Sequence, residues 1–364
     1  MRWPRLTPMF LLALAAALIP LSSAASGAPS GMTKQATGPI KALAMSGSRI
    51  AYDVGNARVL GGSGNKVVVW NVLNGKVTKV SGKRTDQADT TSTGYGVREL
   101  AIAGKRVAWI INQGGNTESG DYLCVSSVAK PKEWLVAEAT RAGPYSSSPG
   151  DWISGLEGSG SVLAANRWHA DDQGNVSNAR LALLTTSGLK RIATGQETIL
   201  AQSTDGTRIA VLRSDGAIAI YSTAGKLLLT VTPPATQQFV FRGALIALEG
   251  KYLVVLTSKR QLELFDSHTG SLLRTLPARG RAKAVPQNLD VEAGLAVYTV
   301  WPDVRVVNLK TGKDRAIGHM RAFRFYYRVF AQIEPAGVVY AGNVRSTTGT
   351  LVFVPFARVA AAVK

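Results

Sequence analysis

The sequence predicts an all-β fold, a seven-bladed β-propeller of four-stranded antiparallel blades. Three observations lead to this prediction. A phrase with a turn glycine recurs seven times in the 364 residues, and its later copies lie about 44 residues apart. Most copies are followed by a pattern typical of a β-hairpin. Outside the first residues no segment keeps a period near 3.6 residues, so helices should be nearly absent.

The recurring phrase consists of a tight turn flanked by short apolar runs, as expected for two paired strands. Its copies are SGSRIAYDV at Ser46, AGKRVAWII at Ala103, GSGSVLAANRW at Gly158, DGTRIAVLRS at Asp205, EGKYLVVLTS at Glu249, EAGLAVYTV at Glu292 and PAGVVYAGN at Pro335. The spacing of about 44 residues holds from Gly160 onward, and it is the period of a four-stranded propeller blade.

A second phrase follows the first and predicts the outer hairpin of each blade. It combines an alternating apolar run, a polar turn with glycine, and another short alternating run. The copies are VVVWNVLNGKV at Val67, LALLTTSGLKRI at Leu181, IAIYSTAGKLLLTV at Ile218, LELFDSHTGSLLRTL at Leu262 and VRVVNLKTGKDRAI at Val304.

Two blades depart from this pattern and leave the blade count open to six or eight. In the second blade only YLCVSSV is clear, and Lys130-Pro131-Lys132 replaces the glycine turn. In the last blade Pro355 argues for an edge strand or a strand end. Ring closure has two solutions: the C-terminal ARVAAAV completes the last blade, or the segment near Lys34 lends it a strand.

These phrases resemble the WD40 and quinoprotein-like β-propeller families, including the YVTN and TolB-like members, over residues 39–360. LFDSHTG and VNLKTG are most similar to the ends of such blades. The Gly-His pair of WD40 repeats occurs only as Gly318-His319, and a Trp-Asp pair is absent from the sequence. The docking tryptophan that follows Thr-Gly in pyrroloquinoline-quinone enzymes is missing; Arg274 stands at that position after Thr269-Gly270. The resemblance therefore implies the fold and no particular enzyme family.

The N-terminus predicts export. Arg2 and Arg5 precede an apolar run from Met9 to Leu21, and Ser22-Ser23-Ala24 is a small-residue cleavage zone. We therefore expect a signal peptide over residues 1–24, a flexible segment over 25–38, the propeller over 39–360 and a tail over 361–364. The mature chain would be secreted or reside in the cell envelope, with no membrane span. Its single cysteine, Cys124, is expected to be a buried strand residue.

The strong positive charge suggests an acidic partner. The formal net charge is +19 and the isoelectric point about 10.2. A basic exported protein can meet nucleic acid, an anionic membrane surface or an acidic envelope polymer. The basic residues are scattered, with no run of five, which argues against nucleic acid. We expect a monomer that binds a protein or an anionic envelope polymer.

Motifs favour a binding or scaffolding module over an enzyme. The sequence has no Walker loop, no Cys-x-x-Cys pair, no HExxH and no Gly-x-Ser-x-Gly, and no catalytic residue is assigned. The alternative is a lactonase-like or lyase-like propeller, which would need carboxylates and histidines that converge on the central channel. An envelope assembly partner similar to the TolB propeller is a third class. A channel lined by Asp, Glu, Asn or His would favour the enzyme, and one lined by Val, Ala and Ser the binding module.

Long insertions place the candidate site on one face. They cover residues 81–99, 111–121, 138–152 and 166–180, and all four fall in B–C loops or blade-to-blade connections. Such segments open on one face of a propeller, and grouped long loops on a rigid scaffold are typical binding surfaces.

The predicted ligand-binding residues follow from these insertions. Tyr95, Tyr145, Trp152 and Trp168 would be apolar contacts, unless they fill grooves between blades. His169, Asp171 and Asp172, in RWHADDQGNVSN, would be the polar edge. A calcium ion could bind there, although the same residues suit a hairpin tip, and no cofactor is otherwise predicted. Arg279, Arg281 and Lys283 would attract an acidic partner to this face.

Overall fold

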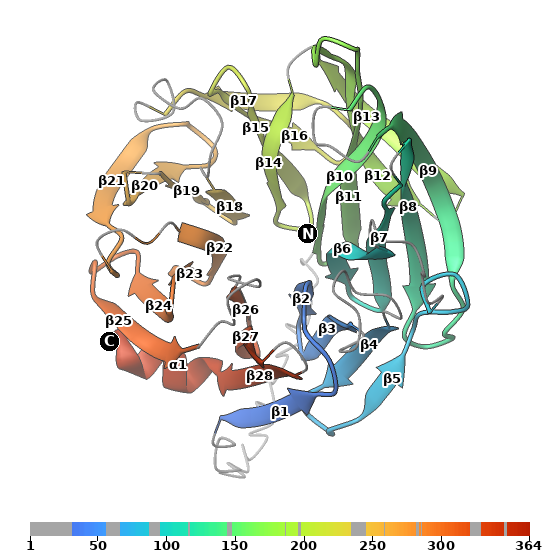
Figure 1. Ribbon diagram of the computed structural model, residues 1–364. Helices are drawn as coiled ribbons and strands as arrows, with labels where there is room; N and C mark the ends of the chain where they lie inside the picture. Colours follow the sequence, from blue (N-terminus) through green and yellow to red (C-terminus); the bar gives the residue numbers. More distant parts are fainter. Residues whose placement is uncertain are drawn as a thin grey trace, which may run out of the picture.

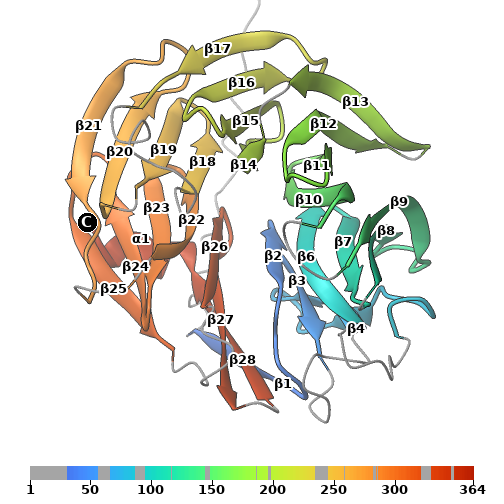
Figure 2. The same ribbon diagram turned by 45° about the horizontal axis from the view of Figure 1, so that its top comes forward.

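The computed structural model describes residues 31–364, with gaps at 56–65, 87–94, 116, 144–147, 186, 196–197, 234–244, 258, 282–283, 285, 321–328 and 346–347. The expected signal peptide, residues 1–24, lies outside the described residues. Within them the chain forms 28 strands and one short helix, so the expectation of an almost all-β protein is confirmed. The sheets stand in a ring around a common centre (Figure 1 and Figure 2).

The sheets follow one another along the chain, each as an antiparallel meander. The first contains β2 (Leu43–Ser46), β3 (Arg49–Val54), β4 (Lys66–Asn71) and β5 (Val77–Lys79). The next contains eight strands: β6 (Tyr95–Ala103), β7 (Arg106–Gln113), β8 (Glu118–Ser127), β9 (Trp134–Ala142), β10 (Gly150–Ser159), β11 (Val162–Ala170), β12 (Val176–Thr185) and β13 (Gly188–Gly195).

Four further sheets of four strands complete the ring. They contain β14 (Ile199–Thr204), β15 (Arg208–Arg213), β16 (Ile218–Ser222) and β17 (Leu227–Val231); β18 (Leu245–Glu249), β19 (Tyr252–Leu256), β20 (Gln261–Asp266) and β21 (Leu272–Pro277); β22 (Pro286–Glu292), β23 (Leu295–Val300), β24 (Asp303–Asn308) and β25 (Asp314–His319); and β26 (Phe330–Glu334), β27 (Gly337–Arg345), β28 (Thr348–Pro355) and β1 (Met32–Ala36).

The innermost strands touch their neighbours around the whole ring. Contacts run in the order β2, β6, β10, β14, β18, β22 and β26, and from β26 back to β2. Buried apolar clusters lie between adjacent sheets; one joins β2–β5 to β6–β8 around Trp109, which is fully buried. Cys124 in β8 belongs to this cluster, as expected, and its burial raises the pKa of its thiol.

The eight-stranded sheet arises from a single backbone pair. The register places Gly150 of β10 opposite Arg141 of β9, and this pair joins β6–β9 to β10–β13. The fourth strand that the sequence did not show in the second repeat is β9, which begins at Trp134 after the Lys130-Pro131-Lys132 segment. The β22–β25 and β18–β21 sheets, by contrast, contain only their own four strands.

The N-terminus closes the ring. β1 pairs antiparallel with β28 over five residue pairs, from Met32–Phe353 to Ala36–Gly349. The expectation of a flexible segment over 25–38 is therefore wrong for Met32–Ala36, because the exposed edge of β28 supplies a hydrogen-bonding partner to that stretch. Of the two proposed closures, the strand near Lys34 is the one observed.

The C-terminal ARVAAAV is helical and does not complete a sheet. Pro355 ends β28 and is followed by α1 (Phe356–Ala362), so the expected tail at 361–364 begins inside a helix. Val359 and Val363 are fully buried and pack with Val338 and Val354 of the same sheet. No helix in the described part of the chain is long and apolar enough to cross a membrane.

The glycine of the outer hairpin is required by contact with the preceding sheet. Gly225 adopts φ of 90°, and a Cβ there would lie 2.2 Å from the carbonyl oxygen of Ile192 in β13. Gly270 adopts φ of 75°, and its Cβ would meet Leu229 and Val231 of β17. Positive φ and close approach both favour glycine. The glycine that recurs in the outer-hairpin pattern of the sequence is therefore explained by the packing of each hairpin turn against the preceding sheet.

One side chain secures the closing strand. The Asn343 Oδ1 atom accepts a hydrogen bond from the backbone N–H of Ile40 at 2.8 Å. Its Nδ2 donates to the carbonyl oxygen of Ile40 at 2.9 Å. Asn343 is only 1% exposed, so both backbone groups of Ile40 would lose their partner in a dry environment without this amide.

We expect Asn343→Ala to lower the free energy of unfolding by about 2–4 kcal/mol, because two buried backbone groups lose their partner. Urea unfolding monitored by circular dichroism measures this loss. Thr350→Val is the matched control, since it removes the partly buried hydrogen bond from Thr350 of β28 to Gln35 of β1, in the same sheet. Equal losses in the two variants would contradict a special role for Asn343.

Candidate functional site

Three of the four insertions that the sequence predicted as loops, 111–121, 138–152 and 166–180, are mostly strand in their described residues, whereas 81–86 of the first form no strand and 87–94 lie outside the described residues. β8, β10 and β12 have 10 residues each, whereas β14–β21 have 5 or 6. The described residues of 111–121, 138–152 and 166–180, without 116 and 144–147, lengthen β7–β12, and we call them the strand extension. Figure 1 shows these strands side by side, in colours from teal (β7 and β8) to green (β10–β12). The expected loop cluster is thus largely a paired sheet, with short connections at its end.

A buried carboxylate holds the strand extension together. Asp121 of β8 is fully buried and accepts hydrogen bonds from Arg98 Nη1 at 3.2 Å, Arg141 Nη1 at 2.9 Å and Asn112 Nδ2 at 3.0 Å. Its second oxygen also lies 3.5 Å from the backbone nitrogen of Ile153 in β10. These groups come from β6, β7, β9 and β10, so one side chain links both halves of the eight-stranded sheet.

Arg141 continues this cluster into an aromatic stack. Its guanidinium lies 3.7 Å from the ring centroid of Trp152, and the Trp152 and Trp168 rings stack at 5.0 Å with 2° between their planes. A cation over an indole face and an offset ring pair are both favourable. Trp152 is 7% exposed, so it fills the sheet interface, whereas Trp168 is half-buried and keeps part of its surface open to solvent.

The neighbouring residues form an exposed charged row. His169 Nδ1 lies 2.9 Å from one oxygen of Asp151, and Arg167 Nη2 donates to the other at 2.8 Å. Partial burial raises the pKa of the Asp151 carboxyl, but the hydrogen bonds from His169 and Arg167 outweigh it, so that pKa lies below its usual value. A carboxylate that stays ionised between two donors orients His169 at the surface.

The tip of the β11–β12 hairpin is stabilised by Asp171. Its carboxylate accepts hydrogen bonds from the backbone of Gln173 at 2.9 Å and of Asn175 at 2.8 Å, and from Asn175 Nδ2 at 2.9 Å. The Asn175 hydrogen bonds are the main reason that the pKa of Asp171 is lowered. Asp172 is exposed. A calcium ion here would compete with the turn for the Asp171 oxygens.

The remaining predicted site residues do not form one group, and Tyr95 pairs with Gln113 of the strand extension. Tyr145 and Lys283 are outside the described residues, and Tyr95 is the first residue of β6. Arg279 and Arg281 are exposed in the connection from β21 to β22, across the ring from β10 and β11 (Figure 1). The Arg281 guanidinium lies 5.6 Å from the Trp301 ring centroid. The structure thus brings Trp152 and Trp168 together on one face of the sheet and places His169 beside Asp151 on the other, with Asp171 and Asp172 at the tip beyond them.

The central channel contains polar groups that the sequence did not reveal as a set. A cavity of about 270 Å³ lies among the innermost strands β2, β6, β10, β22 and β26. Its wall includes Ala42, Ala44 and Ala101, and also the polar residues Lys41, Arg98, Glu99, Glu157, Asn288 and Gln332. We expected a channel lined by Asp, Glu, Asn or His in an enzyme and one lined by Val, Ala and Ser in a binding module. The wall contains both kinds of residue, so its composition does not separate the two.

Irregular strands direct these groups inward. The register shifts between Val97 and Glu99 in β6, between Ser154 and Glu157 in β10, and between Pro286 and Asn288 in β22. Such bulges re-aim side chains and often occur beside functional sites. In β10 the freed N–H of Leu156 donates to Glu99 Oε2 at 2.8 Å. These bulges leave no periodic pattern in the sequence, so the positions of Glu99, Glu157 and Asn288 in the cavity could not be predicted from it.

Two carboxyls resist ionisation: Glu157 in the cavity wall and Asp290 in the innermost strand β22. Burial raises the pKa of Glu157 to about 8, with repulsion from Asp290 and Glu99 adding to it. Burial likewise raises the pKa of Asp290 to about 8, although its carboxylate accepts the N–H of Ile333 at 2.9 Å. Carboxyls that titrate near neutral pH can exchange protons with a bound molecule. All three histidines are exposed and lie away from this cavity.

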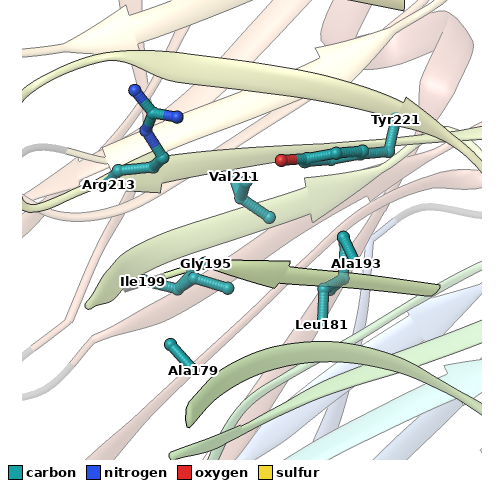
Figure 3. A pocket seen from close by; sticks show the side chains of 8 residues that line it. All are labelled: Ala179, Leu181, Ala193, Gly195, Ile199, Val211, Arg213 and Tyr221. Atoms are coloured by element: carbon teal, nitrogen blue, oxygen red, sulfur yellow. The ribbon is translucent and has the colours of Figure 1, made fainter. Parts of the chain in front are cut away.

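Two other cavities lie outside the candidate site. One, of about 400 Å³, lies at the opposite end of β7 and β8 from the strand extension and is lined by the exposed Trp134 and Leu135. The other, of about 140 Å³, lies between β12–β13 and β14–β16 (Figure 3). Small side chains such as Ala179 and Ala193 leave that gap, and Arg213 and Tyr221 border it. Neither contains a residue singled out from the sequence.

In the described part of the chain, no group of three or more His, Cys, Asp or Glu side chains is arranged to hold a metal ion.

Comparisons with known proteins identify the fold. The WD40 β-propeller domain of Doa1 matches with a TM-score of 0.55 and 11% sequence identity, over 90% of this chain and 97% of that chain. The computationally designed Ika8 protein matches with a TM-score of 0.51 and 13% identity, over 88% of this chain and 98% of that chain. No family model and no curated protein matches the sequence. The resemblance to WD40-like propellers is confirmed, and at these identities it concerns the fold alone.

We expect Asp121→Asn to lower the free energy of unfolding by about 3–5 kcal/mol, because buried Arg141 would keep its charge without a counter-charge. Chemical denaturation followed by tryptophan fluorescence measures this. Asp215→Asn breaks the largely exposed pair with Arg213 and should cost at most about 1 kcal/mol. A loss in Asp121→Asn no greater than in Asp215→Asn would show that the buried cluster is not needed for stability.

The channel carboxyls predict a pH dependence of stability. The folded pKa of Glu157 lies above its ordinary value of 4.5, so the folded chain holds the proton more tightly and stability falls as pH rises from about 4.5 to about 8. Glu157→Gln cannot ionise and should melt a few degrees higher than the natural chain at pH 9, with little difference at pH 5. Differential scanning fluorimetry at both values tests this, with exposed Glu138→Gln as control. A constant offset at all pH values would contradict the account.

Proposed function

We propose that this chain is an exported, non-enzymatic binding or scaffolding module for a protein or anionic polymer of the cell envelope. We further propose that its eight-stranded sheet represents two blades joined at the Gly150–Arg141 pair, which gives a seven-bladed propeller. Support for a binding role comes from the fold, which presents rigid sheets with functional surfaces at their ends.

The observation that carries this proposal is the strand extension. Three features hold the backbone beneath this surface in place: the paired strands, the buried ion cluster, and the contacts of Trp152 with the Arg141 guanidinium and with the Trp168 ring. The open part of Trp168 belongs to the face of the sheet that carries Trp152, and His169 lies on the opposite face beside Asp151. An aromatic surface held in place loses little conformational entropy on binding, so it is a favourable anchor for a partner.

Charge supports an acidic partner. The formal net charge of +19 creates a positive field that accelerates encounter with anionic surfaces and weakens as salt rises. Arg279 and Arg281 are exposed on the connection from β21 to β22, and we propose that they contribute to this attraction at long range. Tyr95 and Tyr145 remain proposed contacts near the strand extension, and Lys283 a proposed part of the basic connection.

A second candidate, a propeller enzyme with a channel site, is favoured by one observation. Burial raises the pKa of Glu157 and of Asp290 to about 8, and the charge of Asp290 adds to the shift at Glu157, so one carboxyl could give up a proton while the other accepts one. The exposed positions of the histidines deprive this site of the imidazole expected for a lactonase-like or lyase-like enzyme. Turnover of lactones or polyuronates that is lost in both Glu157→Gln and Asp290→Asn would support the enzyme.

We expect the double variant Trp168→Ala, His169→Ala to recover about tenfold less partner from a cell-envelope fraction than the natural mature chain, because truncation of an aromatic anchor commonly costs 1–2 kcal/mol. The matched control is His319→Ala, which removes the same kind of exposed pair, His319 Nδ1 with Asp303 Oδ1 at 3.1 Å, from another sheet. Thermal melting verifies that both variants are folded.

Salt separates the two parts of this proposal. Recovery by the natural chain should fall when salt is raised from about 0.1 M to about 1 M, where the screening length shortens from about 10 Å to about 3 Å. Equal recovery by the double variant and the control would remove the strand extension from the binding surface. Recovery that does not respond to salt would remove the electrostatic part.

A further inference from the structure

Two adjacent sheets expose pairs of leucines on their outermost strands. Leu227 and Leu228, which begin β17, are 51% and 47% exposed, and Leu272 and Leu273, which begin β21, are 48% and 49% exposed. The register shifts within both pairs, so that Leu228 has no counterpart in β16 and Leu273 has none in β20. Such a bulge interrupts the regular alternation of side chains between the two faces of a strand. Here both members of each pair are left in water, which favours an occupant that the described chain does not supply.

Packing places the two pairs on the same part of the ring's outer edge. The turn before β21 contacts β17, since the Cβ position of Gly270 lies 3.3 Å from Val231 and 3.5 Å from Leu229. Leu227 and Leu228 precede Leu229 directly, and Leu272 and Leu273 follow Gly270 within three residues. Figure 1 shows β17 and β21 as neighbouring outer strands of the ring. We call Leu227, Leu228, Leu272 and Leu273 the leucine rim.

Exposed cations surround the leucine rim. Lys226 precedes Leu227 and Arg274 follows Leu273, and both are exposed. Arg274 Nη1 donates to the carbonyl oxygen of Lys310 at 2.6 Å, which holds the turn between β24 and β25 against the leucine rim. Lys310 and Lys313 of this turn are exposed.

Acidic groups near the rim are already engaged. Asp266 accepts the backbone N–H groups of His268 and Thr269 in its own turn. Asp314 is buried and pairs with Arg305, and its other oxygen accepts the hydroxyl of Tyr298. In the outer strands and turns at 222–231, 266–277 and 309–316, the exposed charge is therefore positive.

We propose that the leucine rim docks this protein on the surface of an anionic lipid bilayer. Leucine side chains gain free energy by entering the boundary between headgroups and acyl chains, and nearby lysines and arginines are attracted to lipid phosphates. A nucleic acid or a charged polymer would satisfy the cations but leave four leucines in water. The bilayer satisfies both kinds of side chain.

Vesicle co-sedimentation tests the proposal with the mature chain. The natural chain should bind vesicles of equal parts phosphatidylglycerol and phosphatidylcholine at least tenfold more strongly than vesicles of phosphatidylcholine alone, because the anionic surface attracts the cations. The double variant Leu228→Ser, Leu273→Ser should bind the anionic vesicles about tenfold more weakly, because apolar area is lost from the contact. Lys226→Glu with Lys310→Glu should abolish the preference for anionic lipid.

Leu73→Ser is the matched control, since Leu73 is 79% exposed in the turn between β4 and β5, on another part of the ring. It should bind vesicles as the natural chain does. Failure of the natural chain to bind anionic vesicles, or equal binding by the leucine variant and the control, would overturn the proposal. A dimer in sedimentation velocity that the leucine variant dissociates would also overturn it, by assigning the rim to a second copy of the chain.

Discussion

The buried carboxylate of Asp121 is the interaction on which the candidate binding surface depends. β9 and β10 share only the Gly150–Arg141 backbone pair, which by itself is a weak link between two sheets. Asp121 adds hydrogen bonds from Arg98 and Arg141 to that link, and Arg98 Nη2 donates in turn to the carbonyl oxygen of Ile153. A buried ion pair is costly to break once formed, so the two sheets are held in one arrangement.

The same interaction determines where the aromatic residues lie. Arg141 is 5% exposed and can stack on Trp152 only because Asp121 compensates its charge. Trp152 in turn supports Trp168, whose indole N–H donates to Ser154 Oγ at 3.3 Å. The contacts lead from buried Asp121 and Arg141 through the Trp152 ring to the partly exposed Trp168 ring. The position of Trp168 at the surface is therefore fixed by the buried ion pair. Arg98 also connects this cluster to the channel, because it lies in the cavity wall and its Nε is 3.2 Å from Glu99 Oε1. The leucine rim has no described contact with the cluster.

Much of the fold could be predicted from the sequence, because the ring repeats one local pattern. Turn glycines such as Gly160 and Gly206 and the hairpin glycine Gly270 are set by backbone conformation and close packing, which act on each repeat alike. Closure by β1 was one of two alternatives, because the pairing of Met32 with Phe353 joins the two ends of the chain and leaves no local signal.

The strand extension and the channel show where sequence reasoning fails. The turn-rich residues 171–175 form the tip of a hairpin, as the sequence indicated, but the flanking residues 166–170 and 176–180, which were interpreted as part of a long insertion, are strand because β10 and β12 pair with β11. Trp152 and Trp168 were identified, but not which of them is buried. Glu157 and Asp290 were missed because 133 positions separate them in the chain, and only the ring places them across one channel. Bulges that aim Glu157 inward have no periodic signature.

Hydrogen exchange measured by mass spectrometry on the natural chain and on Asp121→Asn tests the central claim most directly. If Asp121 holds the strand extension, exchange should become faster in peptides from β8, β9, β10 and β11, while peptides from β18–β21 keep their protection. Protection that is unchanged in β9 and β10, or that falls equally in every sheet, would contradict the claim that this carboxylate orders the surface locally.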